Sequence, residues 1–195
     1  MSVRAFIAIN LPHAERNRLW DSLAPLRAGS LPVRWTSPES IHLTIKFLGQ
    51  VAERTVPDVE QRLQGVAREH PRFPLDLRGI GAFPSLRKAR IWWVGVQPTP
   101  DLSALHAGIE TTLAESGFDR DERHFAPHLT VGRVKGRRTG SVPPAVLAIA
   151  ESIGYAATIP VRSVDLMQSH LGNPAARYEC IAQAPLAPSH TEDRV

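Results

Sequence analysis

Residues 42–45 read His42-Leu43-Thr44-Ile45, and residues 128–131 repeat this pattern as His128-Leu129-Thr130-Val131. The chain holds 8 His, 19 Leu and 10 Thr among 195 residues, so chance predicts only about 0.04 copies of His-Leu-Thr. Two copies are present, each followed by a β-branched residue, which makes the repeat more specific than most short motifs. The repeat predicts a chain built from two similar halves.

The alternation of side chains along a strand explains the pattern within each copy. In a strand, residues i and i+2 point to the same face, so His42 and Thr44 project together while Leu43 and Ile45 project to the other face. The second copy does the same with His128 and Thr130. If the two strands face one space, that space gains two imidazoles and two hydroxyls.

The rest of the chain alternates predicted strands and helices. Apolar spacing predicts helices over 13–27, 56–66, 100–113 and 144–152, and strands over 4–9, 33–35, 41–48, 73–80, 89–96, 128–134, 161–167 and 178–182. No low-complexity linker divides the chain. We therefore expect one α+β domain over residues 1–184, followed by a polar, flexible tail over 185–195.

Composition excludes several classes of protein. No stretch approaches the roughly 20 apolar residues that a membrane span needs, so no membrane partner is expected. Cys180 is the lone cysteine, which excludes an internal disulfide and a cysteine-based zinc site. The first ten residues resemble a strand and lack the basic region and cleavage site of a secretory signal. These features favour a cytoplasmic protein, and we expect a monomer.

The basic residues are unusual in kind. The formal net charge is only +4, but 20 of the 23 basic residues are Arg. The planar guanidinium matches phosphate oxygens, which favours an anionic partner such as nucleic acid. A genome rich in G and C would produce the same bias, so charge alone does not decide between the two explanations.

The two His/Thr pairs have the chemistry for displacement at a phosphodiester. A neutral His can take a proton from water, and a protonated His can give one to the leaving oxygen. The imidazole pKa of about 6.5 allows both forms near neutral pH. The hydroxyls of Thr44 and Thr130 can donate to the phosphate oxygens. No metal or other cofactor is required, and Pro127 breaks the helix in which His124 and His128 could form a zinc pair.

The two blocks resemble those of a known family, the 2H phosphoesterases, and within it the RNA 2′,3′-cyclic phosphodiesterases, also called LigT-like or 2′-5′ RNA ligase-like proteins. The resemblance rests on Arg34-Trp-Thr-Ser-Pro-Glu-Ser-Ile-His-Leu-Thr-Ile-Lys-Phe-Leu-Gly49 and on Pro127-His-Leu-Thr-Val-Gly-Arg-Val134. It implies a bilobal fold with pseudo-twofold symmetry, in which two antiparallel sheets line a central cleft and the helices lie outside.

The resemblance also implies an activity and roles for residues. It implies hydrolysis of a terminal 2′,3′-cyclic phosphate on RNA to a 2′-phosphomonoester, with His42 as proton donor and His128 as proton acceptor. The two contexts are so alike that the residues alone do not fix which His is which. The family further implies that Phe47 and Arg133 bind base or phosphate. Strict alternation puts both on the face opposite the histidines, so they reach the cleft only if each strand twists, bulges or ends there.

Two other functions stay open. One is a phosphodiesterase for 2′-5′ linkages or small cyclic nucleotides, including reversible 2′-5′ RNA joining. The other is a protein that binds RNA ends without catalysis. The intact His pair speaks against the latter, because binding alone needs cationic donors and not two titrating imidazoles.

Overall fold

The computed structural model describes residues 1–29, 31–136, 141–170, 172 and 177–189. The strands are β1 (Ser2–Asn10), β2 (Val33–Trp35), β3 (His42–Ala52), β4 (Phe73–Phe83), β5 (Ile91–Val96), β6 (His128–Val134), β7 (Ala156–Val161), β8 (Ser163–His170) and β9 (Arg177–Pro185). The helices are α1 (His13–Ser22), α2 (Ala24–Arg27), α3 (Val56–Glu69), α4 (Pro100–Ala114) and α5 (Pro144–Ser152). Three 3-10 turns, η1 (Pro38–Ser40), η2 (Glu53–Thr55) and η3 (Leu86–Lys88), complete the described elements.

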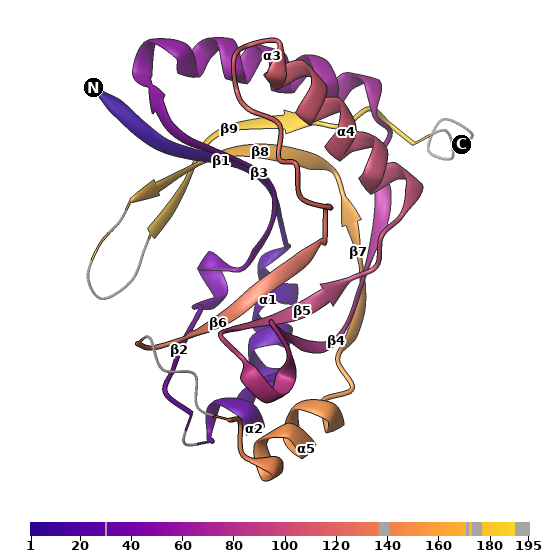
Figure 1. The fold of residues 1–195 in the computed structure, drawn as a ribbon. Coiled ribbons are helices and arrows are strands. Elements are labelled where there is room, and N and C mark those ends of the chain that lie inside the picture. The colour runs from indigo at the N-terminus through magenta and orange to yellow at the C-terminus, as the bar shows by residue number, and fades with distance from the viewer. Residues whose placement is uncertain (30, 137–140, 171, 173–176, 190–195) are drawn as a thin grey trace.

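The described strands form one curved antiparallel sheet with two matching halves (Figure 1). The order is β7-β4-β5-β6-β3-β1-β8-β9, and β2 pairs with the other part of β6. Each half contributes four strands to this order. The innermost strand of each half, β6 or β3, carries a His-Leu-Thr tripeptide. The predicted α+β fold with two similar halves is therefore confirmed, and the two sheets of the expectation are joined into one.

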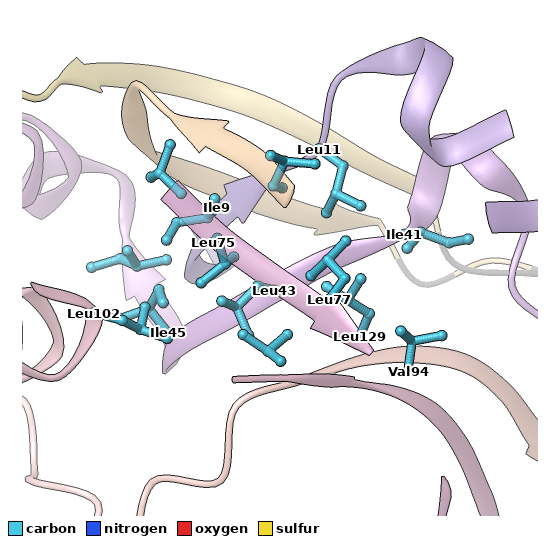
Figure 2. Close-up of a cluster of buried hydrophobic side chains, with 14 of the residues drawn as sticks. Ile9, Leu11, Ile41, Leu43, Ile45, Leu75, Leu77, Val94, Leu102 and Leu129 are labelled. Atoms are coloured by element: carbon cyan, nitrogen blue, oxygen red, sulfur yellow. The ribbon is translucent and has the colours of Figure 1, made fainter. Parts of the chain in front are cut away.

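Strands β3 and β6 join at a single register pair, Leu43 opposite Leu129, and β2 extends the junction with three further pairs along β6. Both leucines are fully buried. Figure 2 shows them in the apolar cluster together with Ile9, Ile45 and Val94. The middle residue of each tripeptide thus connects the two halves on the core side of the sheet.

The helices pack against the apolar face of the sheet. In Figure 1, α3 and α4 lie together beside the half that contains β8 and β9, while α2 and α5 lie at the opposite end of the molecule. All four of these helices have a proline in their first turn, where its missing N–H costs no hydrogen bond. None of the helices in the described ranges is long and apolar enough to cross a membrane.

Three parts of the structure differ from the sequence-based expectation. The helix expected over 13–27 is divided at Leu23, because Pro25 restricts the preceding residue and lacks an N–H. Strand β7 was not predicted; it lies at the edge of the sheet, where Pro160 is tolerated. The third difference concerns the tail.

The tail expected to be flexible from residue 185 starts with packed residues. Pro185 belongs to β9, Leu186 is buried, and Ala187 exchanges backbone hydrogen bonds with the segment at 70–72. The apolar side chain of Leu186 fills part of the core, which explains why the backbone stays attached beyond the strand. Residues 190–195 of the predicted tail lie outside the described residues.

Replacing Leu43 with Ala is expected to lower the free energy of unfolding by about 2–5 kcal/mol, because it leaves a cavity where the halves join. Urea unfolding followed by circular dichroism measures the change. Leu147→Ala on α5 is the matched control, since Leu147 is only partly buried and should cost less. Equal small losses in both variants would contradict a central role for the Leu43–Leu129 pair.

Candidate active site

The register at the join brings the two His/Thr pairs together. Because Leu43 lies opposite Leu129 in an antiparallel ladder, His42 falls opposite Thr130, and Thr44 falls opposite His128. All four side chains therefore project from the same face, away from the apolar core. They line one cavity of about 830 Å³. The predicted alternation is seen in both copies, with the leucine and the β-branched residue buried.

A β-bulge follows each tripeptide. In β3 the partners of Thr44 and Lys46 on β1 are consecutive residues, so Ile45 is the extra residue. In β6 the partners of Thr130 and Gly132 on β5 are likewise consecutive, so Val131 is extra. One inserted residue shifts the alternation by one position. The residues five positions after each His are consequently directed to the histidine side of the sheet.

This shift explains the positions of Phe47 and Arg133. Both line the cavity, and both are exposed to it. The ring of Phe47 lies 6.1 Å from the ring of Phe6 on the neighbouring strand, measured between centroids. The condition set by the sequence, a bulge in each strand, is met.

The ring of His128 is held in one tautomer. Its Nδ1 lies 2.8 Å from the carbonyl oxygen of Ala126. A carbonyl can only accept, so Nδ1 must carry the proton and donate it. In the neutral ring the lone pair then sits on Nε2, and in the charged ring Nε2 carries the second proton. His128 can thus exchange protons with a ligand only through Nε2.

His42 is the more deeply placed imidazole. Its pKa is lowered to about 4, chiefly by burial; a hydrogen bond with the backbone of Ser40 acts in the opposite direction, and the positive charges of Arg16 and Arg133 add to the effect of burial. That bond matches the one at His128, since each His is paired with the residue two positions before it. His42 is therefore neutral at neutral pH while the cavity holds no anion.

Aromatic rings surround both imidazoles. The His42 ring lies 4.9 Å from Phe6 and 5.0 Å from Tyr178, the latter edge to face. The His128 ring lies 5.0 Å from Phe83, also edge to face. These rings form an apolar wall beside each imidazole, and at His42 the burial is deep enough to lower the pKa of the ring.

The two Thr hydroxyls are available to a ligand. Thr44 and Thr130 are partly buried in the cavity wall, and neither side chain makes a hydrogen bond with another described residue. Each hydroxyl can therefore turn its donor toward a group placed between the two strands.

A buried ion pair supports the wall of the cavity. Lys46, two residues after Thr44, places Nζ 2.7 Å from Glu110 Oε2 on α4 and 2.6 Å from the carbonyl oxygen of Asp119. The backbone N–H of Asp121 donates to the same carboxylate oxygen at 3.3 Å. The pair thus ties β3 to the segment 119–126, which ends in the carbonyl that orients His128.

Several site features were missing from the sequence analysis. The rings of Phe6, Phe83 and Tyr178 were not proposed, although alternation in 4–9 separates Phe6 from Ile7 and Ile9. The pair between Lys46 and Glu110 joins positions 64 residues apart and has no local signal. His124 lines the cavity in a segment that is not helical, as Pro127 led us to expect; Ser169 also lines the cavity, whereas Trp92 is fully buried.

The lowered pKa of His42 predicts how stability depends on pH. The unfolded chain binds a proton at this imidazole near pH 6.5, whereas the folded protein resists it until about pH 4. Between these values the unfolded state binds more protons, so this group should reduce stability by up to about 3 kcal/mol as the pH falls from 7 to 4. The His42→Gln variant should not show this part of the decrease. Urea unfolding at pH 7 and at pH 4 measures the free energy of unfolding of both proteins.

His13→Gln is the control for this titration, because His13 is an exposed residue outside the cavity. The control should lose as much stability on acidification as the wild type. An NMR titration should also find the His42 ring half-protonated near pH 4. A value near 6.5 would show that the imidazole is not desolvated.

The comparison with known proteins agrees with the geometry. A family model described as the 2′-5′ RNA ligase superfamily matches residues 16–173. The RNA 2′,3′-cyclic phosphodiesterase of Methanothermobacter thermautotrophicus is 33% identical, and the alignment covers 88% of this chain and 89% of that one. The protein of the same name from Archaeoglobus fulgidus is 35% identical over 87% of this chain and 92% of that one.

A solved structure shows the same fold. The crystal structure of E. coli LigT complexed with 3′-AMP superposes with a TM-score of 0.75 at 26% identity, covering 95% of this chain and 99% of that one. Half of the chain or more is matched in each of these comparisons. The chain therefore belongs to the 2′-5′ RNA ligase superfamily, the 2H phosphoesterases that its paired motifs resemble.

Proposed function

We propose that the protein is a phosphodiesterase that hydrolyses the 2′,3′-cyclic phosphate at the end of an RNA strand and leaves a 2′-phosphomonoester. The observation that carries the proposal is the register at Leu43 and Leu129, which brings two imidazoles and two hydroxyls to one cavity. The names of the relatives supply the substrate class. The E. coli LigT structure complexed with 3′-AMP supports a site for a nucleoside phosphate in this fold.

In the proposed reaction His128 is the base. Its Nδ1 is occupied by the carbonyl of Ala126, so Nε2 takes a proton from the attacking water. Water adds to phosphorus as the bond from phosphorus to the 3′ oxygen breaks. His42 gives its proton to that oxygen. The hydroxyls of Thr44 and Thr130 donate to the two non-bridging oxygens and stabilise their growing charge.

The acid role of His42 depends on the substrate. In the free protein His42 is neutral above about pH 4, so it needs a reason to hold a proton. The phosphodiester brings a negative charge into the cavity and offsets the charge of Arg133, and both effects raise the pKa of a nearby imidazole. Substrate binding thus protonates His42 in the complex in which it acts as the acid. Phe47 and Arg133 are proposed to hold the terminal nucleotide.

The proposed chemistry needs no second subunit and no metal, because its acid, base and hydroxyl donors all come from one chain. We propose that the protein acts as a monomer. We also propose that the enzyme is cytoplasmic, because the lone free Cys180 fits a reducing compartment.

The test is product analysis on a short RNA that ends in a 2′,3′-cyclic phosphate. The wild type should yield the 2′-phosphate, and His42→Ala and His128→Ala should each lower kcat by about 10²–10⁴. His13→Ala, at an exposed site outside the cavity, should leave kcat unchanged. EDTA should also leave it unchanged. A 3′-phosphate product would refute the proposed direction of cleavage, and full activity in either site variant would refute the two-histidine mechanism.

The same site could use a ribose hydroxyl in place of water, as the family description 2′-5′ RNA ligase indicates. Adding an RNA with a free 5′-hydroxyl to the same assay separates the two functions. A joined product with a 2′-5′ linkage would favour the ligase, whereas unchanged yield of the 2′-phosphate favours the hydrolase.

A second experiment assigns the acid and the base. Nitrophenolate leaves without a proton at neutral pH, so bis(p-nitrophenyl) phosphate needs the base but not the acid. His42→Ala should therefore keep most of its activity on this substrate, and His128→Ala should lose it, as followed by absorbance of the released nitrophenolate. The opposite pattern would exchange the two roles without affecting the rest of the proposal.

A further inference from the structure

Three exposed cations continue outward from the cavity along β2 and β6. Arg34 on β2 is the register partner of Arg133 on β6, and Lys135 follows the end of β6. Because directly opposite residues of an antiparallel pair share a face, the Arg34 side chain projects on the same face as Arg133, which lines the cavity. We call Arg34, Arg133 and Lys135 the cationic rim.

The cationic rim is unfavourable for the free protein. Like charges directly opposite each other on paired strands destabilise a sheet. Within the described part of the chain, none of the three cations makes an ion pair. Two other cations of the cavity wall are neutralised, since Arg123 pairs with Asp121 at 2.7 Å and Lys46 pairs with Glu110 at 2.7 Å. An anion bound at the cationic rim would therefore relieve the repulsion between Arg34 and Arg133.

The substrate supplies an anion next to the cavity. The proposed reaction places the terminal cyclic phosphate between the two His/Thr pairs. The next negative charge on an RNA strand is the phosphodiester on the 5′ side of that same nucleotide. Arg133 is close enough to His42 to affect its pKa, so the rim begins beside the reacting phosphate. A guanidinium matches two phosphate oxygens at once, which suits this position.

We propose that Arg34, opposite Arg133, binds the phosphate that links the terminal nucleotide to the preceding one. This inference rests on the proposed function and narrows its substrate to oligonucleotides or 5′-phosphorylated nucleotides. A nucleoside 2′,3′-cyclic phosphate lacks that phosphate and occupies the cavity without engaging Arg34. Arg34 thus distinguishes an RNA end from a free cyclic nucleoside.

Three substrates isolate the contact: adenosine 2′,3′-cyclic phosphate, the same molecule with a 5′-phosphate, and the dinucleotide ApA with a terminal cyclic phosphate. Arg34→Gln should lower kcat/KM for the last two by about tenfold or more, the loss expected for one charge-assisted hydrogen bond. It should not change kcat/KM for the first. Arg34→Lys should recover part of the loss, because it keeps the charge but not the planar fork.

Salt provides an independent measure. Each phosphate contact on a single strand contributes a slope of about −0.7 to the logarithm of affinity against the logarithm of salt concentration. In Arg34→Gln the slope for the dinucleotide should become shallower by about that amount. The melting temperature of the variant should stay the same or rise, since a repulsion is removed.

Arg68→Gln is the matched control, because Arg68 is an exposed residue on α3 outside the cavity. It should leave all three substrates and the salt slope unchanged. If Arg34→Gln weakens turnover of all three substrates equally, or of none, the proposal is wrong. The same comparison by equilibrium binding in the His128→Ala background keeps the test independent of catalysis. If the wild type hydrolyses none of the substrates, the proposed function fails, while the binding comparison still decides on the rim.

Discussion

The antiparallel pairing of Leu43 with Leu129 links the whole structure. It is the only register pair between β3 and β6 among the described residues, and it fixes which face of both strands is apolar. A slip of one residue would turn the His/Thr pairs into the core and the leucines into the cavity. The burial of two leucines therefore determines the position of the polar groups. The same side chains that stabilise the join also define the active site.

Electrostatics at the site favour an anion before one arrives. Burial and two guanidinium groups keep His42 neutral, so in the free cavity the positive charge lies on the arginines and not on this imidazole. The buried pair of Lys46 and Glu110 serves another purpose. A buried ion pair adds little net stability, because desolvation opposes the attraction, but it demands a defined geometry. Here that geometry joins β3, α4 and the segment that orients His128.

The sequence predicted the local features better than the distant ones. The alternation of His42, Leu43 and Thr44 is a property of one strand, and the structure follows it. The bulges at Ile45 and Val131 depend on how neighbouring strands align, which no single strand encodes, so the positions of Phe47 and Arg133 could only be stated conditionally. The contacts of Lys46 and the aromatic walls depend on tertiary packing. The edge strand β7 escaped notice because small residues and Pro160 hide its period.

The way the two halves join has a mechanical consequence. Strand β6 is paired with β3 at Leu129 and with β2 over its last three residues, and β2 leads directly into β3. The ion pair between Lys46 and Glu110 holds β3 from the side of α4 as well. The two imidazoles therefore stand on a braced part of the sheet, and the distance between them is set before a substrate enters the cavity.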